Sequence, residues 1–300
     1  MFSGTLAPGT STGARFQLLG VARDTSFSYS FLVLPPAERQ AIGIVWDFCR
    51  AVDDAVDEAS DPATAAAEVD MWRAEVARVF GADPPATPQG TRLKPFVAQF
   101  SLSRTPFDDL VDGVEMDLRQ ARYETFDDLA AYCRRVASAV GMICIEIFGC
   151  RDARSRDYAL NLGLALQLTN IVRDVAVDFA NGRVYLPQED LRRFGVTDDD
   201  IRAGRVTEPV RRLLAHQCQR ARELFRAAAQ AMPPGAARRL LAAEIMGGIY
   251  FEILKRIEQR GYDVFAEVIR VPKAVRARIA ITTWALTQLS AWGLGGSARA

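Results

Sequence analysis

The sequence predicts an all-α protein that folds as a single helical bundle. Apolar residues recur at helical spacing through most of the chain, and no segment sustains the apolar and polar alternation of a half-buried strand. Proline and glycine clusters divide the helical segments from one another. The 300 residues show neither a shift of composition nor a charged linker that would divide them into two domains.

Proline and glycine mark where the expected helices begin and end. Pro35 and Pro36 open a long helix, because the fixed backbone of proline suits a first helical turn. The segment 81–90, GADPPATPQG, is a surface connection, and MPPG at 232–235 separates two late helices. The expected helices are 15–24, 36–58, 63–80, 92–101, 106–118, 125–148, 152–178, 187–194, 207–231, 235–260 and 272–292.

Charge and cysteine content exclude several classes of protein. The 37 basic and 37 acidic residues balance, so the chain lacks the basic footprint of a nucleic-acid-binding protein. Its five cysteines form no CxxC motif, which is typical of reduced, buried thiols in the cytoplasm. The single histidine, His216, has no second imidazole with which to bind zinc, so we expect it to be structural. The first residues do not resemble a secretory signal.

The chain carries no charge from Ile279 to Ala298. A membrane-spanning helix needs about 20 mainly apolar residues, and threonines and a glycine cluster interrupt this stretch. We therefore expect a packed terminal helix, with peripheral contact at the inner face of a membrane as the alternative. The folded domain is expected to cover residues 15–292, between flexible ends at 1–14 and 293–300.

Two aspartate pairs at helical spacing point to the function. Asp53 and Asp57 follow one strongly apolar segment, and Asp174 and Asp178 follow another. Residues four apart lie one turn above each other, so each pair aims two like charges in one direction. If the two helices face each other, four carboxylates converge on one cavity, and Mg²⁺ prefers such oxygen ligands together with water and phosphate. We count Asp54 among the catalytic candidates. A solvated helix face is the alternative for either pair alone.

Arginine and amide side chains accompany both pairs. Arg50 and Arg173 each precede one pair, so each guanidinium can either bind a phosphate oxygen or pair with the adjacent acid. Gln167 and Asn170 extend a polar stripe along the second helix and can complete a metal shell without adding charge. Ionisation of an allylic diphosphate needs such groups, because the leaving diphosphate must be neutralised.

The carbocation left by that ionisation needs apolar walls that exclude water. Aromatic rings such as Trp46 can stabilise a cation through their quadrupole, although most aromatic residues of helices form core. The candidates are Phe27, Tyr29, Phe31, Trp46, Phe48, Phe126, Tyr132, Phe148, Tyr250 and Phe251. Small residues at 137–141 leave room for a prenyl chain or for close helix packing. The segment 181–191 presents Arg183 and Tyr185 and either closes a pocket or is an ordinary loop.

Five segments, in this order, resemble the squalene/phytoene synthase family, the head-to-head branch of the trans-prenyltransferases. The segments are 26–42 (SFSYSFLVLPPAERQAI), 48–58 (FCRAVDDAVDE), 112–133 (DGVEMDLRQARYETFDDLAAYC), 164–187 (LALQLTNIVRDVAVDFANGRVYLP) and 249–265 (IYFEILKRIEQRGYDVF). The resemblance implies an isoprenoid-synthase fold with a central active-site cavity. It also implies dependence on Mg²⁺, which Mn²⁺ can replace, and the joining of two allylic prenyl diphosphates through a cyclopropylcarbinyl diphosphate.

The same resemblance implies roles for individual residues. Mg²⁺ would be held by Asp53, Asp57, Asn170, Asp174 and Asp178. Substrate would be bound or enclosed by Ser26, Phe27, Trp46, Arg50, Gln167, Arg173, Arg183, Tyr185 and Tyr250. Two positions depart from the family pattern. Trp46 stands where many members have a tyrosine, and Val268 stands where an arginine is common, so diphosphate contact there would fall to Arg270 or Lys273.

Segment 123–151 looks most like the bacterial presqualene diphosphate synthases of hopanoid pathways, which join two farnesyl diphosphates. Phytoene synthases join two geranylgeranyl diphosphates and share the chemical motifs, as do squalene and dehydrosqualene synthases. Pocket depth would separate these substrates, and use of NADPH stays open because this family can bind nicotinamide without a Rossmann motif. Downstream isoprenoid enzymes are the expected partners. A non-catalytic helical assembly factor is the remaining alternative, and the retention of both acid pairs, Asn170 and both arginines disfavours it.

Overall fold

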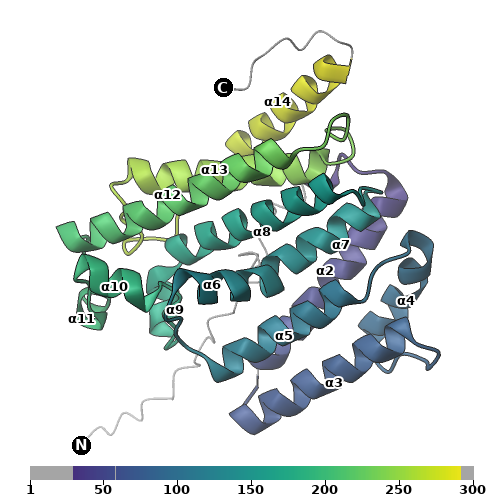
Figure 1. Ribbon diagram of the computed structural model, residues 1–300, viewed down its shortest axis with the longest axis horizontal. Helices are drawn as coiled ribbons and strands as arrows, with labels where there is room; N and C mark the ends of the chain where they lie inside the picture. The colour runs from purple at the N-terminus through teal and green to yellow at the C-terminus, as the bar shows by residue number, and fades with distance from the viewer. Residues whose placement is uncertain (1–29, 58, 292–300) are drawn as a thin grey trace, which may run out of the picture.

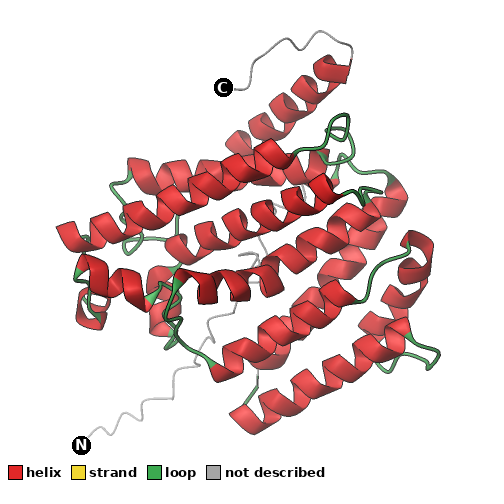
Figure 2. Ribbon diagram, viewed as in Figure 1, coloured by secondary structure: helices red, strands yellow, loops and turns green. Residues whose placement is uncertain are grey.

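The computed structural model describes residues 30–57 and 59–291, without the side chains of Asp57, Ser290 and Ala291. These ranges are helical and contain no β-strand, which confirms the all-α prediction (Figure 2). The helices are α2 (Pro36–Asp57), α3 (Pro62–Phe80), α4 (Pro88–Phe100), α5 (Thr105–Arg119), α6 (Phe126–Cys133), the π-helix η2 (Arg134–Ser138), α7 (Ala139–Ile147), α8 (Ala153–Arg173), α9 (Val175–Ala180), α10 (Gln188–Phe194), α11 (Asp198–Arg202), α12 (Glu208–Ala231), α13 (Leu241–Gln259) and α14 (Lys273–Ala291).

Most helix boundaries follow the prolines and capping residues of the sequence. Five begin with proline in the first turn, namely α2, α3, α4, α5 and α12. Asp61, Thr87 and Thr125 accept backbone N–H groups at the start of α3, α4 and α6. The prediction of a helix from residue 235 was wrong, because turns after Gly235 delay α13 to Leu241. The short α11 was not predicted. The expected helix 15–24 lies outside the described residues.

Helix α8 lies in the middle of the bundle (Figure 1). Helix α12 packs along one side of α8, and α7 and η2 pack on another. Beyond α7, α5 and α2 pack together, and α3 and α4 cover them. Helix α13 contacts both α8 and α12, and α14 packs on α13 (Figure 1). This order leaves α2 and α8 on different sides of α7.

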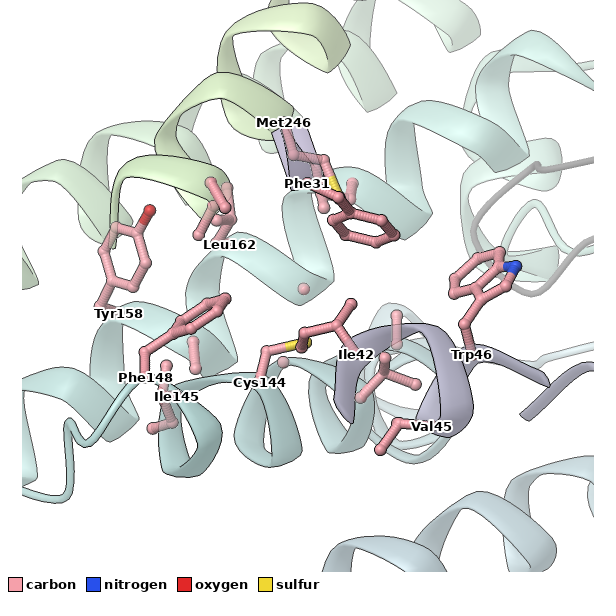
Figure 3. A pocket seen from close by; sticks show the side chains of 18 residues that line it. Phe31, Ile42, Val45, Trp46, Cys144, Ile145, Phe148, Tyr158, Leu162 and Met246 are labelled. Atoms are coloured by element: carbon pink, nitrogen blue, oxygen red, sulfur yellow. The ribbon is translucent and has the colours of Figure 1, made fainter. Parts of the chain in front are cut away.

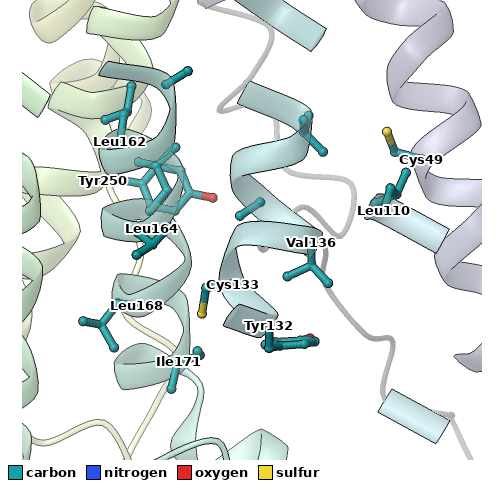
Figure 4. Packing of buried hydrophobic residues seen from close by; sticks show 14 of the residues in the cluster. Cys49, Leu110, Tyr132, Cys133, Val136, Leu162, Leu164, Leu168, Ile171 and Tyr250 are labelled. Carbon is teal, nitrogen blue, oxygen red and sulfur yellow. The ribbon is translucent and has the colours of Figure 1, made fainter. Parts of the chain in front are cut away.

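Long aliphatic side chains of α8 build the core around this helix. Figure 4 shows Leu162, Leu164, Leu168 and Ile171 along α8, with Tyr250 of α13 beside them. All five are at most 8% exposed. Burial of a leucine or isoleucine side chain contributes about 1.5–3 kcal/mol, so this stripe fixes the position of α8 relative to its neighbours.

The predicted helix 125–148 contains a π-helical turn in the structure, at Arg134–Ser138. Glycines of two neighbouring helices face this turn. A Cβ on Gly113 would lie 2.7 Å from Val136, and a Cβ on Gly163 would lie 2.6 Å from Cα of Ser138. The Ser138 hydroxyl donates to the Leu160 carbonyl at 2.9 Å. The turn is therefore held closely between α5 and α8, and π-helical turns are frequent at functional sites.

Candidate active site

An apolar cavity lies between α2 and α8, and α7 and α13 complete its walls (Figure 3). It takes in about 730 Å³, including the part that is open to solvent. Its lining consists of Phe31, Ile42, Val45, Trp46, Ala137, Val140, Gly141, Cys144, Ile145, Phe148, Tyr158, Ala159, Leu162, Gly163, Leu166, Ala242, Ala243 and Met246. None of these residues is charged, so the cavity suits a hydrocarbon chain.

Helices α2 and α8 run in the same direction along this cavity (Figure 3). In Figure 3, α8 advances from Tyr158 to Leu162 in the direction in which α2 advances from Ile42 to Trp46. Farther along the same direction, α2 reaches the first aspartate pair and α8 reaches the second. The directions of α2 and α8 are therefore consistent with the prediction that the two aspartate pairs face each other at one end of the cavity.

The polar stripe predicted on α8 is buried. Gln167 is 4% exposed and Asn170 is 3% exposed. Oε1 of Gln167 and both amide atoms of Asn170 find no hydrogen-bond partner among the described residues. Buried polar groups are nearly always hydrogen-bonded, and leaving one without a partner costs about 1–3 kcal/mol. The stripe is thus arranged for a ligand that brings its own polar or charged groups.

Arg173 and Asp174 form an ion pair at the end of α8. Nε of Arg173 donates to Oδ1 of Asp174 at 2.8 Å, and a second guanidinium nitrogen donates to Oδ2 at 2.5 Å. Burial by itself lowers the pKa of Arg173, but the charge of Asp174 and its hydrogen bonds outweigh this and raise the pKa. Arg173 is 6% exposed, so its guanidinium needs this partner or another anion.

The predicted continuous helix 152–178 has a break at Asp174, whose backbone angles are φ −103° and ψ 12°. Hydrogen bonds of helical spacing nevertheless run through the break. The Asp174 N–H donates to the Asn170 carbonyl at 2.8 Å, and the Asp178 N–H donates to the Asp174 carbonyl at 2.9 Å. Asp174 and Asp178 therefore keep their helical spacing, although the prediction of one continuous helix over 152–178 was wrong.

Asp178 lies in an environment that disfavours its charged form. Burial and the charge of Asp174 raise the pKa of Asp178 well above 3.8, although Arg183 and Arg173 act in the opposite direction. Asp178, Arg183 and Tyr185 also line a second, smaller cavity of about 210 Å³. A cation beside Asp178 would relieve the repulsion from Asp174.

Asp117 of α5 is a site residue that the sequence reasoning missed. Its carboxylate accepts hydrogen bonds from the hydroxyls of Tyr132 and Tyr185, each at 3.0 Å. The two tyrosine rings stack with centroids 5.4 Å apart. The segment after α9 is thereby anchored to α5 and α6. Asp117 lies three and four residues after Val114 and Gly113, which are both buried, and this spacing could have placed it on the inward face of α5.

Of the first aspartate pair, the structure describes the side chain of Asp53 but not that of Asp57. Asp53 is 5% exposed, and it lies near Cys49, because burial and then the charge of Asp53 raise the pKa of that thiol. Asp54 is half-buried, and Arg50 is exposed. Asp57 belongs to the last turn of α2. Among the side chains that the structure describes, no three histidine, cysteine, aspartate or glutamate residues form a metal cluster. Convergence of four carboxylates therefore stays a prediction.

The remaining predicted residues fall into different surroundings. Trp46 lines the apolar cavity. Tyr250 is buried near Arg173, and the charge of the ionised Tyr250 hydroxyl contributes to raising the pKa of Arg173. His216 lies against Asp190 at 3.5 Å, outside the cavity lining. The expected substrate residues Ser26 and Phe27 lie outside the described part of the chain.

These donors fit a hard divalent cation. Carboxylate and amide oxygens are the ligands that Mg²⁺ prefers. Asn170 offers a buried amide oxygen without a hydrogen-bond partner among the described residues, one helical turn before Asp174. Burial and then the charge of Asp174 raise the pKa of Asp178, and a cation bound there would offset both. The site is therefore suited to bind a cation together with an anion that Arg173 can reach.

The chain is similar to known proteins of one family. The model of the squalene/phytoene synthase family matches residues 21–279. The 15-cis-phytoene synthase of Synechococcus elongatus is 37% identical over 261 residues, which cover 82% of this chain and 84% of that enzyme. The presqualene diphosphate synthase of Rhodopseudomonas palustris is 35% identical over 261 residues, which cover 87% and 93%.

A solved dehydrosqualene synthase in complex with a ligand shares the fold. It superposes with a TM-score of 0.81 at 26% identity, over 89% of this chain and 93% of that one. This likeness and the family match also confirm the predicted isoprenoid-synthase architecture and the prediction of an enzyme. The chain therefore belongs to the squalene/phytoene synthase family and is a prenyltransferase that joins prenyl diphosphates head to head.

Proposed function

We propose that this protein joins two farnesyl diphosphates to form presqualene diphosphate, with Mg²⁺ as its cofactor. The observation that supports the proposal is the uncharged cavity between α2 and α8, the two helices that lead to the first and the second aspartate pair. Such a site can bury a prenyl chain while its polar end holds the diphosphate. Cytoplasmic location, as expected from the cysteine content, suits these charged, water-soluble substrates.

The polar end would neutralise the leaving diphosphate. We assign the metal to Asp53, Asp57, Asn170, Asp174 and Asp178. Mg²⁺ bound there would supply positive charge to the departing phosphate oxygens. Arg173 is placed to donate hydrogen bonds to a phosphate oxygen in exchange for its present partner, Asp174. Arg183, which lies near Asp178, would add a second positive charge.

The apolar walls would protect the carbocation. The cavity lining offers Phe31 and Trp46 from the α2 side, and both rings can stabilise a cation in the cavity. Aliphatic side chains of α7 and α8 fill most of the rest. These walls hold no carboxylate or amine, and burial raises the pKa of the Cys144 thiol to about 12, so the wall carries no thiolate either. A cation formed inside would therefore react with the second prenyl chain rather than with the protein.

The C15 substrate is favoured by the resemblance of segment 123–151 and by the presqualene diphosphate synthase of R. palustris, 93% of which the alignment covers. A second candidate is phytoene synthesis from two geranylgeranyl diphosphates. It is supported by the phytoene synthase of S. elongatus, at 37% identity. Identities of 37% and 35% are too close to decide between the two substrates.

Product analysis tests the proposal. The purified protein is incubated with Mg²⁺ and either farnesyl or geranylgeranyl diphosphate, with and without NADPH, and the products are identified by mass spectrometry. We expect presqualene diphosphate from the C15 substrate, unchanged by NADPH. Phytoene from the C20 substrate would replace the leading proposal with the second candidate. Squalene formed only with NADPH would add a reductive step. No product from either substrate would contradict both candidates.

Variants of Asp174 test the assignment of the polar end. Asp174→Ala should abolish turnover while circular dichroism still shows a helical protein. Asp174→Asn keeps a hydrogen-bond acceptor for buried Arg173 and serves if the alanine variant does not fold. Asp157→Ala is the matched control, because Asp157 is an exposed aspartate on the same helix. Undiminished turnover in both Asp174 variants would remove this residue from the proposed metal site.

A further inference from the structure

Helix α14 exposes large apolar side chains. Ile281 is 64% exposed, Trp284 49%, Leu286 60% and Leu289 45%. These are four of the seven large apolar residues that are exposed in the described part of the chain. In Figure 1, α14 extends past the end of α13, away from the rest of the bundle. The outer face of α14, which carries Ile281, Trp284 and Leu289, is thus an apolar surface that no described element covers.

The opposite face of α14 is packed. A Cβ on Gly248 of α13 would lie 2.9 Å from Cγ2 of Ile279, so the two helices approach closely there. Arg276 and Thr287 are each at most 4% exposed. At 100° per residue, Ile281, Trp284 and Leu289 fall within about 140° on the side away from these contacts. The apolar surface therefore belongs to a helix fixed on the bundle.

Basic residues flank the apolar surface, and acidic residues are missing from it. Arg270, Lys273 and Arg278 are exposed at the start of α14 and just before it. At the other end, the Arg238 guanidinium donates to Gln288 at 3.0 Å. No acidic residue follows Glu267 in the sequence. In a chain with equal numbers of acidic and basic residues, this is a local excess of positive charge.

We propose that the outer face of α14 docks on the surface of an anionic phospholipid bilayer. Apolar and tryptophan side chains beside basic residues are characteristic of helices that lie in the plane of a membrane interface. Basic residues near an anionic lipid surface add electrostatic attraction to the apolar contact. Among the described helices, none is long and apolar enough to span a membrane, so α14 lies on the bilayer.

Charge favours lipid over a second copy of this chain. A two-fold symmetric contact places the same surface patch on both partners. Across α14 such a contact would bring Lys273 and Arg278 of one copy toward basic residues of the other, without a described acid on the patch to pair with them. Anionic headgroups supply the missing negative charge.

Docking would set the cavity close to the membrane. Helix α13 packs directly beneath α14 and contributes Ala242, Ala243 and Met246 to the cavity wall. One helix therefore separates the lipid-facing surface from the space assigned to the prenyl chains. This consequence depends on the proposed function, whereas the docking itself does not.

Vesicle flotation of the full chain tests the proposal. Vesicles of phosphatidylcholine alone are compared with vesicles that also contain phosphatidylglycerol. We expect binding to the anionic vesicles, at least tenfold weaker binding for the double variant Ile281→Glu with Trp284→Glu, and weaker binding at high salt. Arg278→Glu should weaken binding to anionic vesicles alone. Leu32→Glu is the matched control, because Leu32 is also 64% exposed but lies before α2.

Several outcomes would overturn the proposal. They are an unbound wild-type chain, a double variant that binds as well as wild type, and equal loss of binding in Leu32→Glu. A further contradicting outcome would come from analytical ultracentrifugation. If the wild-type chain were a dimer and the double variant a monomer, α14 would be a protein interface. The double variant should keep wild-type turnover of dissolved substrate. Vesicle binding without turnover in wild type would contradict the proposed function and leave the docking intact.

Discussion

Replacement of Asp117 by alanine tests the anchor that holds the segment after α9. The carboxylate accepts hydrogen bonds from the hydroxyls of Tyr132 and Tyr185, both at 3.0 Å. These tyrosines are 0% and 5% exposed, so the alanine variant leaves two buried hydroxyls without this acceptor. A buried donor without a partner costs about 1–3 kcal/mol. Because the two hydroxyls also hydrogen-bond each other, one of them keeps an acceptor in the variant. We therefore expect the free energy of unfolding to fall by about 1–3 kcal/mol.

Urea denaturation followed by circular dichroism measures this loss. Asp117→Asn keeps one acceptor oxygen and should lose about half as much stability. Tyr185→Phe removes one of the two hydrogen bonds, so its effect and that of Asp117→Ala should be less than additive in the double variant. Turnover should fall in all of these variants, because Tyr185 lies two residues from Arg183. A loss below about 1 kcal/mol in Asp117→Ala would refute the reasoning.

Two further predictions concern packing and pH. Gly163→Ala should lower the free energy of unfolding by about 1–3 kcal/mol, because the new Cβ would lie 2.6 Å from Cα of Ser138. Gly43→Ala is the matched control and should raise it by up to about 1 kcal/mol, because nothing lies within 4 Å of the new Cβ. Equal effects of the two variants in thermal denaturation would contradict the packing argument. Burial raises the pKa of Glu75, but hydrogen bonds from the segment 86–87 outweigh this and hold the pKa below 4.5. The stability contributed by the charged form is present above pH 4.5 and is lost as the pH falls through the lowered pKa. Urea midpoints should therefore fall more steeply with acid in wild type than in Glu75→Gln, and parallel curves would show that Glu75 does not contribute in this way.

Local signals in the sequence determined most of the fold. The prolines at residues 36 and 62 stand at helix starts in the structure, since their effect depends only on the nearest turn. Pro88 also opens a helix, α4, so the prediction that the whole segment 81–90 is a connection was wrong. Turns after Gly235 and the break at Asp174 escaped prediction, because apolar spacing continues through both. Periodicity reports which residues face inward, and it is insensitive to a single distorted residue.

The candidate active site was likewise predicted only in part. The stripe of Gln167 and Asn170 and the cavity wall at Trp46 could be read from the sequence, because each follows from the face of one helix. The partnership of Asp117 with Tyr132 and Tyr185 joins residues 15 and 68 positions apart. Only packing of α5 against α6 and the segment after α9 brings those side chains together, and no local pattern encodes that distance.

The ion pair of Arg173 with Asp174 has a consequence for the order in which ligands bind. While the two side chains hold each other, each is occupied by the other's charge. A cation that takes the carboxylate releases the guanidinium for an anion, and an anion that takes the guanidinium releases the carboxylate for a cation. Since linkage is reciprocal, each ligand must raise the affinity for the other by the same factor. Two neighbouring residues would thereby make this mouth of the cavity bind a metal and a diphosphate together more readily than either alone.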